Sequence, residues 1–148
     1  MIYFQTEDIS FVLKNKALLK KWITLVIEKK KKKTGAINFI FCSDSYLLDI
    51  NQNYLKHNTF TDIITFDYSK NQQNTPISGD IFISIERVKE NANKYDVSFE
   101  NELHRIIIHG ILHLLGYTDK KKIDKEEMTK AENNSLLLLN KTQKAKTS

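Results

Sequence analysis

Apolar and polar residues follow two rhythms along this chain, and each rhythm predicts one kind of element. Short apolar runs of roughly four to eight residues are typical of strands, whereas apolar residues that recur every third or fourth position are typical of amphipathic helices. The first pattern predicts strands at residues 2–5, 36–42, 62–68 and 80–85. The second predicts helices from about residue 11 to the lysine run at 29–33, and at residues 43–55, 98–115 and 122–140.

The order of these elements predicts an α+β fold. A helix joins the first two strands, which favours a crossover, and the polar loop NQQNTPISG joins the last two, which favours an antiparallel hairpin. We therefore expect a mixed four-stranded sheet covered by helices. Because the chain has 1 proline and no linker rich in Gly or Ser, residues 1–148 are predicted to form a single domain, with about 141–148 as a flexible basic tail.

The charge balance favours a polyanionic partner. The net charge is +5, and residues 29–33 are an unbroken lysine run. Nucleic acid is the first partner that such a surface predicts, and an acidic membrane surface is the second. An alternative is that a chain rich in Lys, Asn and Ile throughout reflects the base composition of its genome.

The remaining composition excludes several classes of protein. No apolar run approaches the roughly 18 residues of a membrane span, and the first residues lack the layout of a signal peptide, so we expect a cytoplasmic protein with no membrane partner. The single cysteine, Cys42, lies in the apolar segment INFIFC. It is predicted to be a small buried hydrophobe rather than a nucleophile.

The stretch HGILHLLGYTD, residues 109–119, carries the clearest chemical signal. His109 and His113 are four apart, so on a helix they share one face. Gly116 can end the helix and let Asp119 return to the same point. Two imidazoles and a carboxylate, with a position left open for water, are typical of a catalytic zinc site on a zincin-like metal-binding helix.

The pattern H-x-x-x-H-x-x-G-x-x-D matches the spacing of metzincin ligands, with one difference. Gly110 stands where HExxH peptidases have the glutamate that acts as general base. An ordinary buried helix with histidines is the alternative to a metal site. His104, which is out of phase with the other two, is predicted to be a surface or internally satisfied residue, and His57 lies in a predicted loop.

Three further blocks make the chain resemble a known family, the YbeY-type endoribonucleases of rRNA maturation. INQNYLKHNTFTDIITFDY is similar to the helix-loop-strand signature of that family, GDIFIS to its next strand, and FENELHRIIIHGILHLLGY to its metal helix. The resemblance implies a zinc-dependent, single-strand-directed endoribonuclease that acts in late 16S rRNA 3′-end maturation and ribosome quality control. It also implies RNA and the small ribosomal subunit or associated factors as partners.

Carried over by position, the resemblance places one zinc ion on His109, His113 and Asp119. The family commonly has a histidine at the third position, and a carboxylate there makes the ion a weaker Lewis acid. Leu55 stands where the family typically has an arginine, a residue suited to a phosphate contact.

The remaining functional residues are hypotheses from their positions. Glu102 and Asp62 could orient the ligands from outside the metal shell. The basic residues that could contact RNA are Lys56, His57, Lys120, Lys121 and Lys122. Phe60, Phe66, Tyr68 and Tyr117 could stack on bases, although strand and core roles are favoured for each.

Two other functions use the same residues. A zinc-containing ribosome assembly or RNA-binding factor would need the metal only to fix the turn. A zinc metallopeptidase would keep the ligands but lacks a base in the motif, so it is the less favoured alternative.

Overall fold

A computed structural model describes residues 1–56, 59–69 and 74–147. Helices and strands follow one another as β1 (Ile2–Glu7), α1 (Lys16–Lys29), β2 (Thr34–Cys42), α2 (Asp44–Tyr54), β3 (Ile63–Asp67), β4 (Ile77–Ser84), α3 (Ile85–Tyr95), α4 (Phe99–Leu114) and α5 (Lys122–Thr147). All four strands and four of these helices coincide with predicted ones, and the α+β class is confirmed.

The four strands form one mixed sheet in the order β1-β2-β4-β3. β1 and β2 are parallel and are joined by α1, as the predicted crossover requires. β4 runs parallel to β2, and β3 pairs with β4 as an antiparallel edge strand, so the predicted hairpin is confirmed.

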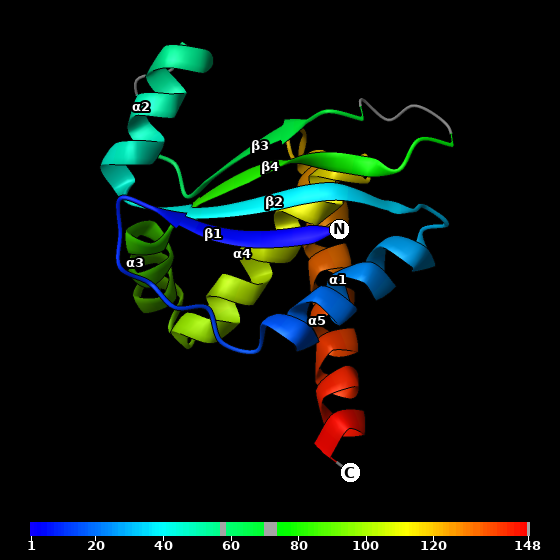
Figure 1. The fold of residues 1–148 in the computed structure, drawn as a ribbon. Coiled ribbons are helices and arrows are strands. Elements are labelled where there is room, and N and C mark those ends of the chain that lie inside the picture. Colours follow the sequence, from blue (N-terminus) through cyan, green and yellow to red (C-terminus); the bar gives the residue numbers. More distant parts are fainter. Residues whose placement is uncertain (57–58, 70–73, 148) are drawn as a thin grey trace.

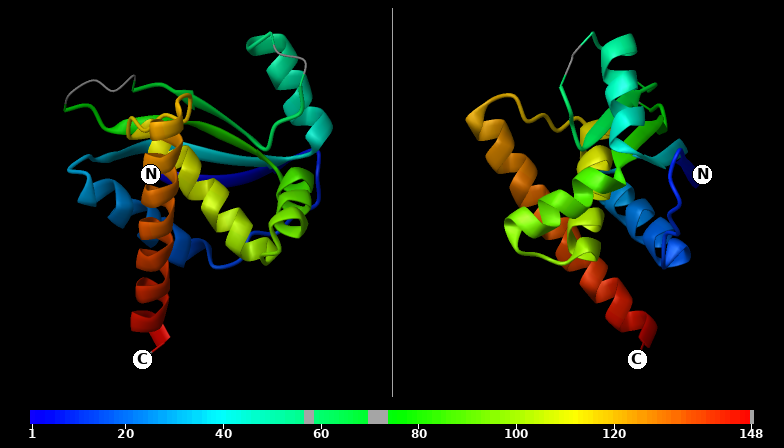
Figure 2. Two further views of the ribbon diagram at one scale, coloured as in Figure 1. Left: turned by 180° about the vertical axis from the view of Figure 1, so that it is seen from behind. Right: turned by 90° about the vertical axis from the view of Figure 1, so that its left-hand side faces the viewer.

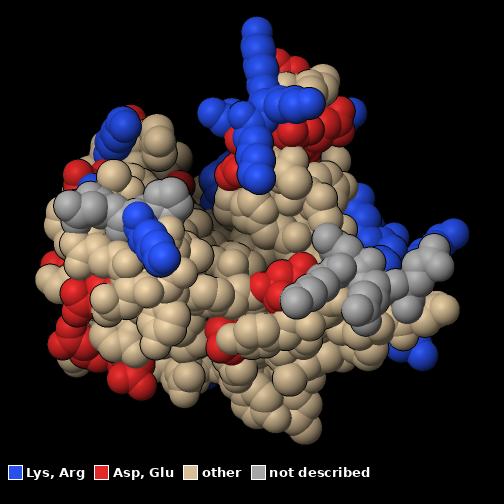
Figure 3. All heavy atoms as spheres, turned by 90° about the horizontal axis from the view of Figure 1, so that it is seen from above, with Lys and Arg blue, Asp and Glu red and all other residues tan. Residues whose placement is uncertain are grey.

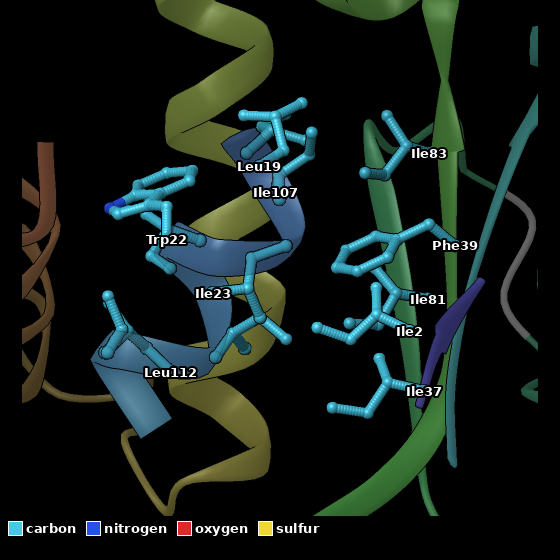
Figure 4. Packing of buried hydrophobic residues seen from close by; sticks show 14 of the residues in the cluster. Ile2, Leu19, Trp22, Ile23, Ile37, Phe39, Ile81, Ile83, Ile107 and Leu112 are labelled. Atoms are coloured by element: carbon cyan, nitrogen blue, oxygen red, sulfur yellow. The ribbon is translucent and has the colours of Figure 1, made fainter. Parts of the chain in front are cut away.

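The helices divide unequally between the two faces of the sheet. α1, α3, α4 and α5 lie on one face, whereas α2 stands on the other face at one end (Figures 1 and 2). The main core fills the space between the sheet and the four-helix side, where Phe39 and Ile81 of the strands face Ile23 and Ile107 of the helices (Figure 4). A smaller cluster under α2 includes Cys42, which is fully buried as predicted.

Two glycines allow close packing around β4. A Cβ at Gly79 would lie 2.2 Å from the backbone oxygen of Phe66 on the neighbouring strand. A Cβ at Gly110 of α4 would lie 2.9 Å from Cγ2 of Ile81 and 3.2 Å from Cδ1 of Ile63. α4 can therefore approach the sheet closely only because position 110 has no side chain.

The structure corrects the prediction at two elements. α3 was not predicted, because its sequence IERVKENANKY is largely polar and only Ile85, Val88 and Ala92 are buried. α1 begins at Lys16 rather than near residue 11, because Asn15 adopts a left-handed backbone with φ 61° that interrupts the helix.

Single residues also differ from expectation. Phe60 and Tyr68 are exposed, 54% and 61%, so the core roles favoured for them are wrong. His104 is partly buried beside Trp22, and burial lowers the pKa of its ring. α5 continues to Thr147, so residues 141–147 are helical; the single domain and the flexible tail stay predictions. Within the described ranges, no helix is long and apolar enough to span a membrane.

Candidate metal centre

Helix α4 presents two histidines from successive turns. Ser98 caps its start by accepting a hydrogen bond from the backbone N–H of Asn101, and nine buried residues hold the helix against the core. His109 and His113 lie on the edge of that buried face, and their Nε2 atoms are 3.1 Å apart. The predicted face of the helix is therefore the one that carries both imidazoles.

The end of α4 returns the chain to these histidines. Gly116 has a left-handed backbone with φ 105°, and its N–H donates to the carbonyl of His113. The N–H of Tyr117 donates to the carbonyl of Leu112, which completes the pair of bonds that ends many helices at a glycine. A residue with a Cβ would be strained at position 116, so the glycine sets the direction of the following loop.

That loop places Asp119 beside the two rings. Its Oδ2 lies 3.5 Å from Nε2 of His109 and 3.6 Å from Nε2 of His113. One ligand atom from each of the three residues lies within 4.8 Å of the others. The structure thus brings the three predicted ligands together at one point.

A residue outside the sequence motif orients His109. Nδ1 of His109 lies 2.6 Å from Oε2 of Glu132 on α5. Because a carboxylate can only accept, the ring carries its proton on Nδ1, and the lone pair of Nε2 faces His113 and Asp119. The other carboxylate oxygen of Glu132 accepts from Nη1 of Arg105 at 2.8 Å. Histidine ligands of metals are commonly held in this way.

The three side chains line a cavity of about 400 Å³. Its remaining wall comes from β3 and the residues before it: Thr61, Asp62, Ile63, Thr65 and Asp67. The hydroxyl of Thr65 is buried and has no hydrogen-bond partner among the described residues.

Burial and charge together raise the pKa of His109 and lower the pKa of His113. Burial alone would lower the pKa of His109, but the hydrogen bond and charge of Glu132, with Asp119 and Asp62, outweigh it and raise the pKa. Burial and the neighbouring His109 lower the pKa of His113, although Asp119 opposes them. His113 is therefore the ring more readily kept neutral, which is the form that binds a metal.

Asp62 and Glu102, the two carboxylates predicted to orient the ligands, occupy different places. Asp62 lines the cavity, and its Oδ2 accepts from Asn91 at 3.1 Å. Glu102 is buried one turn before the Arg105 that contacts Glu132, and it does not line the cavity. Burial raises the pKa of both carboxyl groups, and the charge of Asp62 raises the pKa of Glu102 further.

The predicted RNA contacts do not line this cavity. Lys120–Lys122 are exposed in the segment that leads into α5, and Lys56 is exposed just after α2. His57 lies outside the described residues. Figure 3, seen from above, shows basic side chains gathered over the start of α5, behind a hollow that lies between this segment and α2. Leu55 caps the C-terminal end of α2 and is 41% exposed, and no arginine stands among the described residues that line the cavity.

The donor set fits a divalent transition metal. Two imidazole nitrogens and one carboxylate oxygen converge, and the Glu132 contact prepares one ring for binding. Gly110 faces Ile81 and Ile63 of the sheet, so a general base at that position is absent for a packing reason. The cavity therefore suits metal-assisted hydrolysis without the base of an HExxH peptidase.

Sequence reasoning missed Glu132, Arg105 and Thr65. Glu132 is 23 residues after His109, and only the packing of α5 on α4 makes them neighbours. In the sequence, Glu132 is one glutamate beside the apolar positions of the last helix, and little marked it as a functional residue.

Known proteins match this chain over most of its length. A family model described as "Endoribonuclease YbeY" matches residues 1–140. A relative of that name from Flavobacterium psychrophilum is 49% identical over 138 residues, covering 93% of this chain and 96% of the relative. One from Amoebophilus asiaticus is 48% identical over 131 residues, covering 88% of each. A solution structure of a structural-genomics target from Thermotoga maritima aligns with a TM-score of 0.68 and 25% identity, covering 99% of this chain and 93% of that one.

Proposed function

The chain belongs to the endoribonuclease YbeY family, and from this premise we propose that it cuts single-stranded RNA in the cavity lined by His109, His113 and Asp119. Its RNA is the 3′ region of 16S rRNA, cut during late maturation and quality control of the small ribosomal subunit. The cofactor is one zinc ion, and the site of action is the cytoplasm. The convergence of two Nε2 atoms and one carboxylate oxygen carries the proposal.

The side chains of the cavity divide the work of phosphodiester hydrolysis. His109, His113 and Asp119 would hold the zinc ion, which would supply a Lewis acid and lower the pKa of a water molecule to about 7. Glu132 keeps His109 in the tautomer whose Nε2 can bind a metal. Asp62, whose pKa burial raises, lies in the same wall and is placed to exchange a proton with the substrate.

Charge limits how strongly this cavity attracts RNA. Asp62, Asp67 and Asp119 all line it, and a carboxylate as third ligand in place of a histidine lowers the net positive charge of the loaded site. Exposed lysines, including Lys120–Lys122 beside the loop, offset part of this repulsion at low salt.

The test is cleavage of a labelled single-stranded RNA that ends in a 16S 3′ sequence. Wild type is compared with His113→Ala and Asp119→His, each with and without a chelator, at low salt. Wild type is expected to cut, His113→Ala and chelation to abolish cutting, and Asp119→His to retain it, because histidine is also a zinc ligand.

Two outcomes would overturn the proposal. Cutting that survives in His113→Ala would come from another site or a contaminating nuclease. RNA binding without any cutting, together with metal content that falls in His113→Ala, would identify the chain as an assembly factor whose metal only fixes the turn.

A further inference from the structure

The lysine run of the sequence forms a defined surface, which we call the lysine patch: Lys29, Lys30, Lys31, Lys32 and Lys33. It covers the end of α1 and the approach to β2 (Figure 1). Among the described residues, none of the five takes part in an ion pair. Five adjacent ammonium groups without a counter-charge repel one another, so a polyanion that binds them relieves this repulsion.

The backbone under the lysine patch is fixed. The N–H groups of Lys30 and Lys32 both donate to the carbonyl of Ile27, and the carbonyl of Lys33 accepts from the N–H of Ile77 on β4. Lys31 holds a left-handed backbone with φ 60°, a conformation that is costly for a residue with a Cβ. The turn therefore displays the lysines from a rigid support, which lowers the entropy lost on binding.

One end of the lysine patch reaches the loop that carries a metal ligand. The Nζ of Lys30 lies 5.3 Å from the ring centre of Tyr117. Tyr117 stands between His113 and Asp119 in the chain, and its ring, Lys29 and Lys30 line a common cavity of about 320 Å³ with Lys130. The patch and the metal centre thus share the loop between α4 and α5.

The other end continues away from the metal centre. Lys31, Lys32 and Lys33 line a second cavity of about 400 Å³ with Asn74, Thr75 and Pro76, which precede β4. Glu127 is the single acidic residue among the described linings of these two cavities. The cleavage cavity, by contrast, has three carboxylates in its wall.

From this contrast we propose that the lysine patch binds the backbone of the RNA outside the cleavage cavity. The inference rests on the proposed function. An RNA strand in an acidic cavity gains little affinity there, so its binding energy comes from phosphates held elsewhere. The lysine patch has no ion pair among the described residues, and it meets the metal loop where Lys30 lies over the ring of Tyr117.

The test measures binding rather than cleavage. Fluorescence anisotropy measures the binding of labelled single-stranded RNA to chelator-treated protein at a series of salt concentrations. One variant combines Lys29→Gln, Lys30→Gln and Lys33→Gln. The matched control combines Lys14→Gln, Lys16→Gln and Lys21→Gln, exposed lysines just before α1 and in its first half, and so lowers the net charge by the same amount. Circular dichroism checks that both variants fold.

The lysine patch variant is expected to bind an RNA of about 16 nucleotides roughly tenfold more weakly, and to flatten the salt dependence by about 2, since each contact to a single strand contributes about 0.7. The control variant keeps the wild-type slope.

Equal losses in the two variants would overturn the proposal, because net charge alone would explain them. An unchanged salt slope in the lysine patch variant, with lost binding to an acidic polypeptide probe, would assign the patch to a protein partner instead. Because binding is measured without metal, its result can be interpreted even if the protein does not cleave RNA.

Discussion

Glu132 shows how a single residue outside a motif can control it. It holds the Nδ1–H of His109 through one oxygen and the guanidinium of Arg105 through the other. Its side chain is only 10% exposed, so water does not replace either contact easily. The ring orientation of His109 therefore depends on a helix that the ligand motif does not include.

Replacing this carboxylate should weaken metal binding. Glu132→Gln keeps the shape of the side chain but loses the charge that favours the Nδ1–H tautomer, and outer partners of this kind are worth about 10- to 100-fold in metal affinity. Isothermal titration with zinc measures the change. Glu126→Gln, on the exposed face of the same helix, serves as the control and should keep wild-type affinity. Equal affinities for the two variants would remove Glu132 from the site.

The unpartnered hydroxyl of Thr65 makes a second prediction. If bound RNA accepts a hydrogen bond from this hydroxyl, that bond is worth about 1.4 kcal/mol, or about tenfold in kcat/KM. Thr65→Val should lose that factor and Thr65→Ser should retain most of the activity, with metal content unchanged in both. Thr34→Val is the matched control, because its hydroxyl is also buried and unpartnered but lies outside the cleavage cavity. Identical losses at the two positions would mean a general effect on folding.

Cys42 makes a prediction about pH. Burial, with smaller contributions from Asp8 and Asp44, raises the pKa of its thiol to about 12. The protonated thiol is thus favoured in the folded state, and this stabilisation is present below the ordinary pKa of about 9 and is lost as the pH rises through the folded pKa. Folded protein at pH 8 should react with iodoacetamide far more slowly than protein in denaturant. Equal rates would show that the thiol is accessible.

The convergence of the three proposed metal ligands could be predicted from the sequence because their relation is local. His113 is four positions after His109, and Asp119 is six positions after His113. Helix geometry and one glycine therefore suffice to bring them together. Glu132 and Arg105 meet only through the packing of two helices, which periodicity does not specify. Thr65 was missed for another reason: its importance comes from lacking a partner, and only coordinates show that.

Among the helices and strands, local pattern succeeded where apolar residues are dense. The strand at residues 36–42 and the helix at 98–115 were predicted closely for this reason. α3 was missed because Ser84 ends β4 and at the same time caps the helix, accepting from the N–H of Arg87. No turn residue separates β4 from α3. The apolar spacing therefore changes from that of a strand to that of a helix without any signal in the sequence.

The contact of α4 with the sheet predicts the effect of a methyl group. Gly110→Ala raises helix propensity by up to about 1 kcal/mol, but its Cβ would meet the branched side chain of Ile81 at 2.9 Å. Overpacking of this kind costs about 1–3 kcal/mol, so the net free energy of unfolding should fall. Urea denaturation measures it, with Asn101→Ala on the exposed side of α4 as the control. A more stable Gly110→Ala would show that the sheet yields at this point.

At the scale of the whole molecule, α5 packs the C-terminal part of the chain against α1 in its N-terminal part. Its buried residues pack on α1 and α4, and the carbonyl of Ser135 accepts from the indole N–H of Trp22 at 2.7 Å. Beyond residue 140 the helix is mostly exposed through residue 145. The inner part of α5 is thus part of the core, whereas its end is surface.

Truncation should separate these two parts. Removal of residues 141–148 is expected to change the thermal midpoint by little, and to weaken RNA binding at low salt because three lysines are lost. Removal of residues 128–148 should unfold the protein, since Met128, Ala131 and Leu139 belong to the core. Differential scanning fluorimetry compares the two. A large loss of stability in the shorter truncation would contradict the view that this end is surface.

The position of Glu132 near the end of the chain has a consequence for synthesis. Translation produces the ligands His109, His113 and Asp119 before it produces α5, and domains fold from the N-terminal side as they emerge. A chain interrupted in this interval has all three ligands but neither the carboxylate that orients His109 nor the last layer of the core. If the site binds a metal as proposed, tight binding is expected only after α5 has been made, and a product that ends before α5 should be a poor nuclease as well as an unstable protein.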